Sequence, residues 1–259
     1  KLMLTHNELI SKFKELGIKD GDVILLHSSF KSLGTVCSGP DYVIHALLDI
    51  LGKNGTLIVP TFNFDFCNGS SFNVNETPSQ MGIITELIRK NPDSIRTKDP
   101  VYSFAIIGKL KEKLGNLVYE SSYGKDSMFA QLRKHDGKIL IIGLAYNDYM
   151  TFFHHVEEME GCDYRYFKEF NGNLINFDGI KQKTKIKIFV RNLEKKVETD
   201  VDKMGVILEN KGLVNKIKIG DVDIKFLDVN QVYIHTAEEL KNNPHILCKF
   251  NSWNYRKAL

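Results

Sequence analysis

DVILLHSS (residues 22–29) is a continuous apolar run that ends in small polar side chains. Its length suits one strand. Because successive side chains of a strand point to opposite faces, an unbroken apolar run predicts a strand that is buried on both faces. The same pattern recurs in GTLIVPTF (55–62), YSFAIIG (102–108) and KILIIGL (138–144). Strands of this kind are typical of the central sheet of an α/β protein.

Helical patterns lie between these strands. THNELISKFKELGI (5–18) opens with Thr5 and Glu8, which have the spacing of a capping box. GPDYVIHALLDILG (39–52) has a proline at its start and a glycine past its end, an order that helices favour. Two further stretches have a helical pattern: TPSQMGIITELIRKNP (77–92) and SMFAQLRKHDG (127–137). The alternation of strands and helices predicts a layered α/β sheet.

The pattern changes near Phe170. KTKIKIFVRNL (183–193) and VDIKFLDVNQVYI (222–234) alternate apolar and polar residues, which predicts strands with one wet face. DVDKMGVILENKG (200–212), between them, has a helical pattern. No Pro/Gly-rich linker separates the two parts. We therefore predict one domain over residues 1–259, with a core over about 1–170 and a smaller, antiparallel C-terminal layer over about 171–250.

The composition excludes several classes of protein. The chain is 42% apolar and 26% charged, with a net charge of +3, as in an ordinary globular protein. It has no basic block rich in aromatic residues, no apolar run of about 20 residues and no signal-peptide pattern, so we expect no nucleic acid, no membrane and a cytoplasmic location. The cysteines lack metal or C-x-x-C spacing and are expected to be free thiols: Cys37, Cys67, Cys162 and Cys248.

Polar side chains follow three of the predicted strands. They are His27, Ser28 and Ser29 after the first, Thr61, Asn63 and Asp65 after the second, and Asn147, Asp148, Thr151 and His154 after KILIIGL. In open α/β sheets ligands bind beyond the carboxyl ends of the strands. If the three strands are parallel, these side chains converge on one cleft.

TFFHHVEEMEGC, which begins at Thr151, contains the strongest candidate for catalysis. With Thr151 as N-cap, His154 takes the third helical position, where the helix dipole disfavours imidazolium. Glu157 and Glu158 share a helix face with His154, whereas His155 is turned about 100° away. A neutral histidine beside a carboxylate can act as a general base. The alternative is that these residues only pack and complement the dipole.

Other motifs leave alternatives open. His154 with Glu157 or Glu158 could supply two metal ligands, but H-E-x-x-H is absent and we expect no metal. The long loop 62–82 is expected to be functional because structureless loops of this length usually are. Within it, Cys67 is a weak candidate for an acyl-enzyme nucleophile. GCDYRYFKEFNG (161–172) could stack on a base and grip phosphate, or could form a lid packed on the core.

The sequence resembles the aminoglycoside 3-N-acetyltransferase family from about residue 20 to 172, and more weakly to about 248. The stretches that carry the resemblance are HSSFKSLG (27–34), SGPD (38–41), GTLIVPTF, TPSQMGIITELIRK, SFAIIG, GKILIIGL and TFFHHVEE. The resemblance implies an α/β/α sandwich with a mixed central sheet. It also implies an acyltransferase that uses a coenzyme A thioester as co-substrate, without a permanently bound cofactor.

The resemblance also implies site residues. It places the family's H-x-x-E catalytic pair on His154 and Glu157, with the coenzyme on Ser28 and Ser29 and near Ser103. We expect His154 to deprotonate an amine, which then attacks the thioester directly, and Glu157 to orient the imidazole, with Glu158 as second choice. Donors to the oxyanion are expected from Ser28, Ser29 and Thr151. Expected substrate-binding residues are Asp65, Asp99, Glu158, Tyr164 and Arg165.

One departure from the family guides the choice of acceptor. Drug-modifying members have R-S-x-H-P before the SF strand, whereas RTKDP has Thr97 and Asp99 in place of that serine and histidine. We therefore expect a nucleotide-linked amino sugar as acceptor, in the synthesis of bacterial surface polysaccharide such as the O-antigen of lipopolysaccharide. The alternatives are an aminoglycoside acetyltransferase that confers antibiotic resistance and a non-catalytic sugar-binding module. Acyl-CoA and an amino sugar are the expected partners, and we allow for a homo-oligomer.

Overall fold

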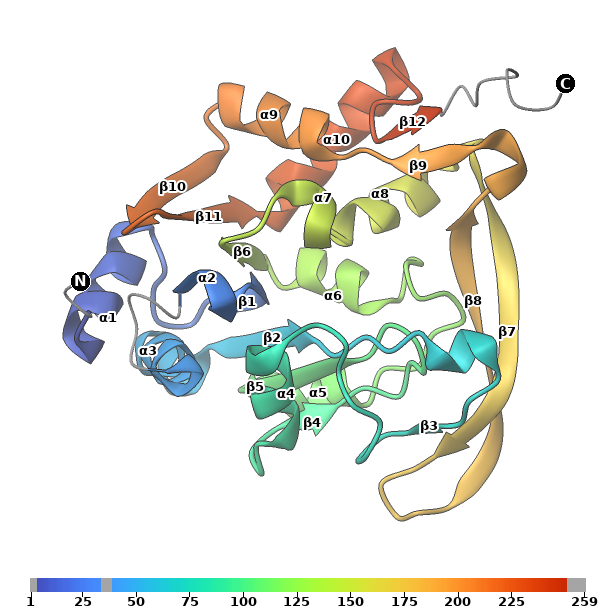
Figure 1. The fold of residues 1–259 in the computed structure, drawn as a ribbon, viewed down its shortest axis with the longest axis horizontal. Coiled ribbons are helices and arrows are strands. Elements are labelled where there is room, and N and C mark those ends of the chain that lie inside the picture. The colour runs from blue at the N-terminus through green and yellow to red at the C-terminus, as the bar shows by residue number, and fades with distance from the viewer. Residues whose placement is uncertain (1–3, 34–38, 251–259) are drawn as a thin grey trace, which may run out of the picture.

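A large mixed sheet lies at the centre of the molecule (Figure 1), whose computed structural model describes residues 4–33 and 39–250. Its seven strands have the order β10-β11-β6-β1-β2-β5-β4. Their bounds are β1 (Val23–Ser28), β2 (Thr56–Pro60), β4 (Ile95–Arg96), β5 (Phe104–Gly108), β6 (Lys138–Ile142), β10 (Val214–Ile219) and β11 (Val222–Asp228). The first quoted run, DVILLHSS, forms β1 in the middle of this sheet.

Strand β1 is parallel to both of its neighbours, β2 and β6. Leu25 faces Ile58 on β2 and Ile139 on β6 in the register of the sheet. The outer neighbours β5 and β11 are antiparallel to β2 and β6, so the sheet is mixed. Because β1, β2 and β6 are parallel, the polar segments that follow them begin at the same edge of the sheet, as the sequence predicts.

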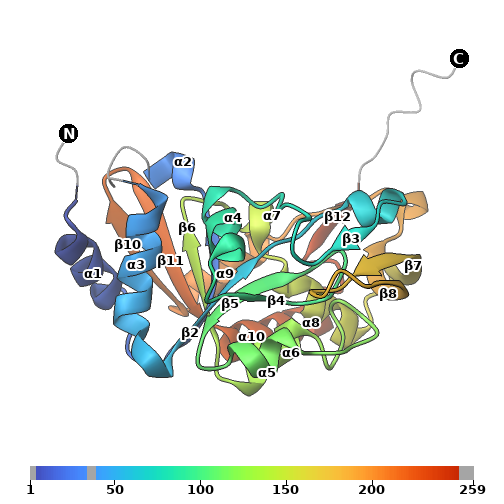
Figure 2. The same cartoon turned by 90° about the horizontal axis from the view of Figure 1, so that it is seen from below.

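Helices cover both faces of the sheet (Figure 2). Alternating side chains of β1 enter two separate cores, with Leu25 on one face and Ile24 and Leu26 on the other. One face is covered by α1 (His6–Glu15), α3 (Pro40–Leu51) and α4 (Ile83–Lys90). The other is covered by α6 (Met128–Lys134), α8 (Phe152–Glu160), α9 (Asp202–Asn210) and α10 (Val229–Asn242). The α/β/α fold class expected from the sequence is confirmed.

A long antiparallel hairpin stands at one end of the molecule (Figure 1) and consists of β7 (Arg165–Ile175) and β8 (Lys181–Arg191). β3 (Phe72–Asn73) adds to it in parallel, and β9 (Val197–Thr199) pairs separately with β12 (Cys248–Phe250). The hairpin is the expected smaller layer, but it begins at Arg165, earlier than the predicted boundary at about 171. The short helices are α2 (Phe30–Leu33), α5 (Lys111–Gly115) and α7 (Tyr146–Tyr149).

Two details of the sequence-based secondary structure are wrong. Residues 222–234 are not one strand of the small layer, because β11 joins the central sheet beside β6 and the chain then turns into α10. The Asp228 side chain caps that helix by accepting a hydrogen bond from Gln231 N. The helix expected from residue 77 begins only at Ile83, since the Thr77 hydroxyl accepts a hydrogen bond from Asn73 N within the preceding loop.

Other sequence expectations concern the start of the chain, membranes and thiols. The capping box of Thr5 and Glu8 is confirmed at the start of α1. No helix in the described ranges is both long and apolar enough to cross a membrane. Cys67, Cys162 and Cys248 are free thiols, and Cys37 lies outside the described residues.

Candidate active site

His154 occupies the third position of α8, as expected from the sequence. Thr151 stands at the N-cap position, but its hydroxyl donates to Tyr149 O and makes no capping hydrogen bond. Phe152 and Phe153 are buried in the core and fix the first turn. The helix ends at Gly161, whose φ of 68° is the left-handed conformation that glycine adopts without strain.

Glu157 is the carboxylate that contacts His154. Its Oε2 lies 2.6 Å from His154 Nδ1 and 2.7 Å from Arg165 Nε, and its Oε1 accepts a hydrogen bond of 2.8 Å from the Tyr164 hydroxyl. The Glu157 side chain is only 1% exposed. Glu158 points elsewhere, where it accepts a hydrogen bond of 2.6 Å from the Ser121 hydroxyl. The structure therefore identifies Glu157 as the partner of His154, a choice that helix geometry alone leaves open between Glu157 and Glu158.

Burial and charge keep the His154 imidazole neutral. Burial lowers the pKa of His154, and the nearby guanidinium groups of Arg165 and Arg191 lower it further, whereas Glu157 opposes them. The direction agrees with the sequence-based expectation, but the cause is burial and these cations rather than the helix dipole. Burial alone would raise the pKa of Glu157, but Arg165 and His154 outweigh it and hold the carboxyl group ionised.

The contacts of Nδ1 determine which ring nitrogen can accept a proton. Both Glu157 Oε2, at 2.6 Å, and Arg165 Nη2, at 2.8 Å, approach Nδ1. A hydrogen on Nδ1 satisfies the carboxylate, while Arg165 already donates to Phe189 O and pairs with Glu157 through Nε. The shorter, charge-assisted contact favours hydrogen on Nδ1. Nε2 then carries the lone pair and is the nitrogen available to a substrate.

His154 is 18% exposed and lines a cleft of about 380 Å³. The Tyr123 ring lies 5.3 Å from the imidazole, and the Tyr102 ring lies 4.9 Å from that of Tyr123. The remaining lining residues are Arg165, Tyr166, Lys168, Phe170, Ile188, Phe189, Val190, Arg191, Leu193 and Thr199. The cleft therefore lies between α8 and the β7–β8 hairpin, and no carboxylate is among the described residues that line it.

The serines after β1 form a separate local structure. Ser29 N donates to Ile142 O, and the Ser32 hydroxyl donates to Ser29 Oγ, which ties the start of α2 to the end of β6. The Ser28 hydroxyl is buried and has no hydrogen-bond partner among the described residues. No hydrogen bond, ion pair or ring contact within residues 4–33 and 39–250 joins Ser28 or Ser29 to His154. The segments that carry these residues thus start at the same sheet edge, but no polar contact of the described residues joins them.

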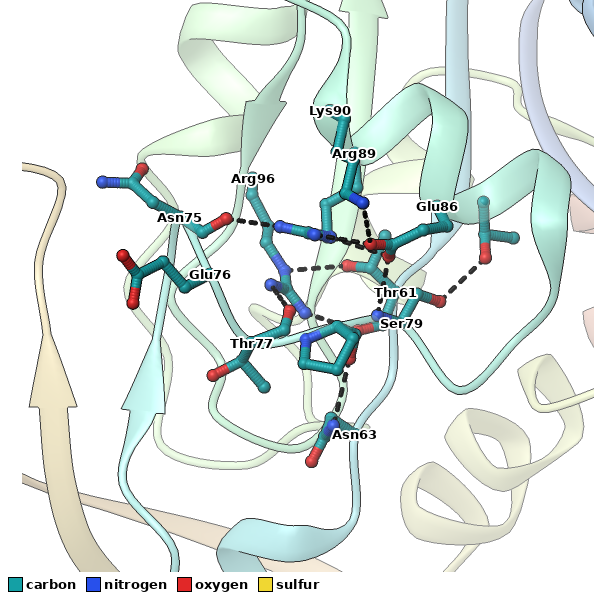
Figure 3. A network of polar contacts seen from close by, with 12 residues as sticks. Thr61, Asn63, Asn75, Glu76, Thr77, Ser79, Glu86, Arg89, Lys90 and Arg96 are labelled. Carbon is teal, nitrogen blue, oxygen red and sulfur yellow. Dashed lines mark hydrogen bonds and ion pairs between the residues drawn. The ribbon is translucent and has the colours of Figure 1, made fainter.

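Ser103 belongs to a buried network around Arg96, a residue that sequence reasoning missed. Figure 3 shows Arg96 between Thr61 and Thr77 of this network. Arg96 Nε donates to Thr61 Oγ1 and Ser103 Oγ, each at 3.1 Å, and Nη2 donates to Thr61 O at 2.8 Å. Nη1 donates to the carbonyl groups of Val74 and Thr77 in the long loop. Arg96 therefore fastens this loop to the end of β2, and the Ser103 hydroxyl is occupied inside the protein.

Asp65 and Asp99 have very different surroundings. Asp99 is 5% exposed and accepts hydrogen bonds from Val101 N, Tyr102 N and the Ser122 hydroxyl. Its carboxylate thus holds the turn before Tyr102, and burial raises its pKa. Asp65 is exposed on the long loop, where Gln80 Nε2 donates to it at 3.2 Å.

Two chemical alternatives find no support in the site. Within the part of the chain that the structure describes, no three His, Cys, Asp or Glu side chains gather closely enough to hold a metal ion. Burial and the nearby Asp99 raise the pKa of the Cys67 thiol, so that thiol stays protonated. Of the cleft residues, Tyr102, Tyr123 and Arg191 were also missed, because only the folded hairpin and loops bring them beside His154.

Comparison with known proteins gives one consistent family. The sequence profile described as aminoglycoside 3-N-acetyltransferase matches residues 25–241. The chain is 30% identical over 176 residues to aminoglycoside N(3)-acetyltransferase IX of Micromonospora chalcea, covering 60% of this chain and 62% of that protein. It is 31% identical to the aminoglycoside N(3')-acetyltransferase-like protein YokD of Bacillus subtilis, covering 59% and 64%. The matched part thus spans less than two thirds of these relatives.

Solved structures share the fold. The aminoglycoside acetyltransferase AAC(3)-Xa superimposes with a TM-score of 0.81 at 20% identity, covering 92% of this chain and 93% of that chain. AAC-IIIb, solved as a binary complex with CoASH, superimposes with a TM-score of 0.81 at 19% identity, covering 93% of this chain and 97% of that chain. AAC-VIa, solved with sisomicin, superimposes with a TM-score of 0.80 at 21% identity, covering 93% of this chain and 98% of that chain.

These relatives overturn the acceptor expected from the sequence. The nucleotide-linked amino sugar and the role in surface polysaccharide synthesis are wrong, because the matching family and its members are aminoglycoside acetyltransferases. The structure also removes an argument for a nucleotide. Tyr164, expected to stack on a base, is fully buried and holds Glu157, and Arg165 is 8% exposed and pairs with the same carboxylate.

Proposed function

The chain belongs to the aminoglycoside 3-N-acetyltransferase family, and on that premise we propose that it transfers a short acyl group, most simply acetyl, from coenzyme A to an amine of an aminoglycoside. The observation that carries this proposal is the His154–Glu157 pair at the cleft. The buried, ionised carboxylate of Glu157 contacts Nδ1 of His154, so Nε2 of His154 can accept a proton. This is the arrangement of a general base with its orienting partner.

The reaction needs no covalent enzyme intermediate. His154 Nε2 takes a proton from the acceptor nitrogen as that nitrogen bonds to the thioester carbonyl carbon. The C–S bond then breaks, and the proton passes to the leaving sulfur, which gives the amide and free coenzyme A. A neutral amine is a good nucleophile, so the main task of the site is to remove a proton at neutral pH. A histidine whose pKa is lowered by burial meets that need.

The acyl donor acts as a co-substrate, with no resident cofactor. In the proposal, Ser28, Ser29 and Thr151 supply donors to the thioester or to the oxyanion of the tetrahedral intermediate. The Ser28 hydroxyl, which has no partner among residues 4–33 and 39–250, supports this role, because a buried donor without a partner costs free energy until a ligand accepts from it. Ser103 is a weaker candidate, since Arg96 and Thr61 already use its hydroxyl.

Carboxylates outside the cleft lining are candidates for contacts with the amino groups of the acceptor. AAC-VIa, a structural neighbour, was solved with sisomicin, and such ligands carry several amines. The exposed Asp65 and the half-buried Glu158 are the candidates with accessible oxygens. In this proposal Tyr164 and Arg165 position the Glu157 carboxylate through a hydrogen bond and an ion pair. Asp99 stabilises the turn before Tyr102 by accepting hydrogen bonds from Val101 N and Tyr102 N.

A thiol-release assay tests the proposal. With acetyl-CoA and sisomicin, the native protein should release free coenzyme A. His154→Ala should reduce turnover by about 10²–10⁴-fold, the usual contribution of general-base catalysis, while coenzyme A binding measured by calorimetry survives. The exposed His45 provides the control, because His45→Ala should leave turnover unchanged. No thiol release with any aminoglycoside and several acyl donors would contradict the proposal and favour a binding module.

A further inference from the structure

The two adjacent histidines of α8 contact the same tyrosine. The ring of His154 lies 5.3 Å from the ring of Tyr123, measured between the ring centres, and His155 Nδ1 lies 2.6 Å from Tyr123 O. Tyr123 and His154 both line the cleft, whereas the His155 side chain is fully buried. The proton transfer proposed for the reaction uses His154 alone. His155 is therefore a buried titratable group that contacts the backbone of a cleft residue.

The contacts of His155 define which of its ring nitrogens carries the hydrogen. Burial lowers the pKa of His155 to about 4, so the ring is neutral near pH 7 and has one N–H donor. Because the Tyr123 carbonyl oxygen can only accept, that hydrogen lies on Nδ1. Arg133 Nη1 lies 3.5 Å from Nε2, a long contact in which the guanidinium donates. The Tyr233 ring, whose centre lies 3.3 Å from Arg133 Cζ, supports that guanidinium.

Tyr123 lies in the segment 117–127, which connects α5 to α6 and contains no helix or strand. Side chains from elsewhere in the fold hold three consecutive residues of it. The Ser121 hydroxyl donates to Glu158, the Ser122 hydroxyl donates to Asp99, and Tyr123 O accepts from His155. Tyr123 is only 1% exposed, and a buried carbonyl group without a donor costs free energy. The position of the Tyr123 backbone therefore depends on His155.

The Tyr123 ring in turn restricts the base. Glu157 Oε2 contacts one edge of the His154 imidazole through Nδ1, and the Tyr123 ring packs against the same imidazole at an interplanar angle of 55°. Nε2 must meet the acceptor nitrogen within hydrogen-bond distance to take its proton. A displacement of about 1 Å in such a group can lower turnover by about 10²-fold. The packing of Tyr123 therefore bears directly on the rate.

We infer that His155 is a positioning residue of the active site: its Nδ1–H···O hydrogen bond to the Tyr123 backbone keeps the Tyr123 ring against the His154 imidazole. His155 acts through Tyr123, because its own ring is buried and does not line the cleft. The enzymatic meaning of this inference rests on the proposed function. The two adjacent histidines then have different tasks, since His154 moves the proton and His155 fixes the wall beside it.

Three variants test the inference by kinetics. His155→Asn places an amide N–H near the position of Nδ1, whereas His155→Leu has no donor. At saturating substrates His155→Leu should lower kcat by about 10–10²-fold, with the KM for acetyl-CoA nearly unchanged, and His155→Asn should restore most of the rate. Arg133→Met is the matched control, because it removes the contact to Nε2 and leaves the hydrogen bond from Nδ1. An equal loss of kcat in Arg133→Met, or no rescue by asparagine, would overturn the inference.

A double-mutant cycle shows whether His155 acts through Tyr123. Tyr123→Leu should lower kcat in the same range as His155→Leu. The double variant should be no slower than Tyr123→Leu alone, because the ring that His155 holds in place is already absent. Losses that multiply in the double variant would show that His155 acts by another route and would refute the inference.

NMR separates this inference from the proposed function, because it needs no turnover. In the native protein we expect hydrogen on Nδ1 of His155 and contacts between the ring protons of Tyr123 and His154. The His154 ring-proton signals should move in His155→Leu and keep their native positions in His155→Asn and Arg133→Met. If they do so but no acyl transfer occurs, the positioning role stands and the proposed function fails. Hydrogen on Nε2 of His155 in the native protein would refute the inference even if acetyl transfer is observed, and this measurement needs no variant to fold.

Discussion

Replacing Glu157 with glutamine removes one charge from the centre of the site and keeps its shape. The new side chain can still accept from the Tyr164 hydroxyl, but an amide NH₂ in place of Oε2 cannot accept from His154 Nδ1, which lies 2.6 Å away. Nδ1 then accepts from Arg165 Nη2 at 2.8 Å, and the ring hydrogen moves to Nε2. The base would face the substrate with its hydrogen rather than its lone pair.

Two effects add in this variant. Loss of a general base lowers turnover by about 10²–10⁴-fold, and we expect a fall of this size when His154 is held in the wrong tautomer. Glu157 also raises the pKa of His154 against the effect of Arg165, so its loss leaves the imidazole still less basic. Because Arg165 becomes a buried cation without its carboxylate, the free energy of unfolding should fall by about 3–5 kcal/mol.

The assay measures thiol release at saturating acetyl-CoA and acceptor, together with urea unfolding to confirm that the variant is folded. Glu160→Gln is the control, because Glu160 lies on the same helix with its side chain exposed and accepts a hydrogen bond from the Tyr233 hydroxyl. It should keep turnover within about 2-fold, since surface substitutions change free energies by about 0.5 kcal/mol or less. A folded Glu157→Gln protein with native turnover would refute the reasoning.

Three further perturbations follow from the same structure. Burial lowers the pKa of His27 and of His155 to about 4, so the unfolded chain takes up protons at a higher pH than the folded chain does. The free energy of unfolding, measured by urea denaturation, should therefore fall by about 1.4 kcal/mol per pH unit for each histidine as the pH is lowered from about 6.5 to about 4. A free energy that does not change over this range would contradict the prediction. Arg96→Met removes the donors that fasten the long loop and should lower the free energy of unfolding by about 2–4 kcal/mol, measured by urea denaturation. Arg191→Met should raise the pKa of His154 and move the acidic limb of the turnover profile to higher pH, whereas an unchanged limb or a shift to lower pH would show that Arg191 does not lower the pKa of the base.

The central sheet could be predicted from the sequence because its strands are short apolar runs buried on both faces. In DVILLHSS and KILIIGL the successive apolar side chains are buried on both faces of the sheet, as an unbroken apolar run of strand length predicts. The C-terminal region was harder, because alternation in residues 222–234 fits a half-wet strand as well as a strand followed by an amphipathic helix. The cap at Asp228 decides between them, and a cap signal is weak within an alternating pattern.

The candidate base could also be located from the sequence, because helix periodicity puts His154 on one face with two glutamates. The choice of Glu157 depended on family resemblance, and its physical reason appears only in the fold. Tyr164 and Arg165 approach that carboxylate from the start of β7, after the helix has ended. Arg96 and Arg191 could not have been found in this way, since each acts on segments that only tertiary packing brings together.

The protonation state of the His154 ring tests the account most directly. A long-range ¹H–¹⁵N NMR spectrum of the native protein near pH 7 distinguishes a protonated from an unprotonated ring nitrogen, and the spectrum of His154→Ala assigns the signals. The contact with Glu157 predicts a neutral ring with its hydrogen on Nδ1 and an unprotonated Nε2. A hydrogen on Nε2, in either the other neutral tautomer or an imidazolium, would contradict His154 as the base.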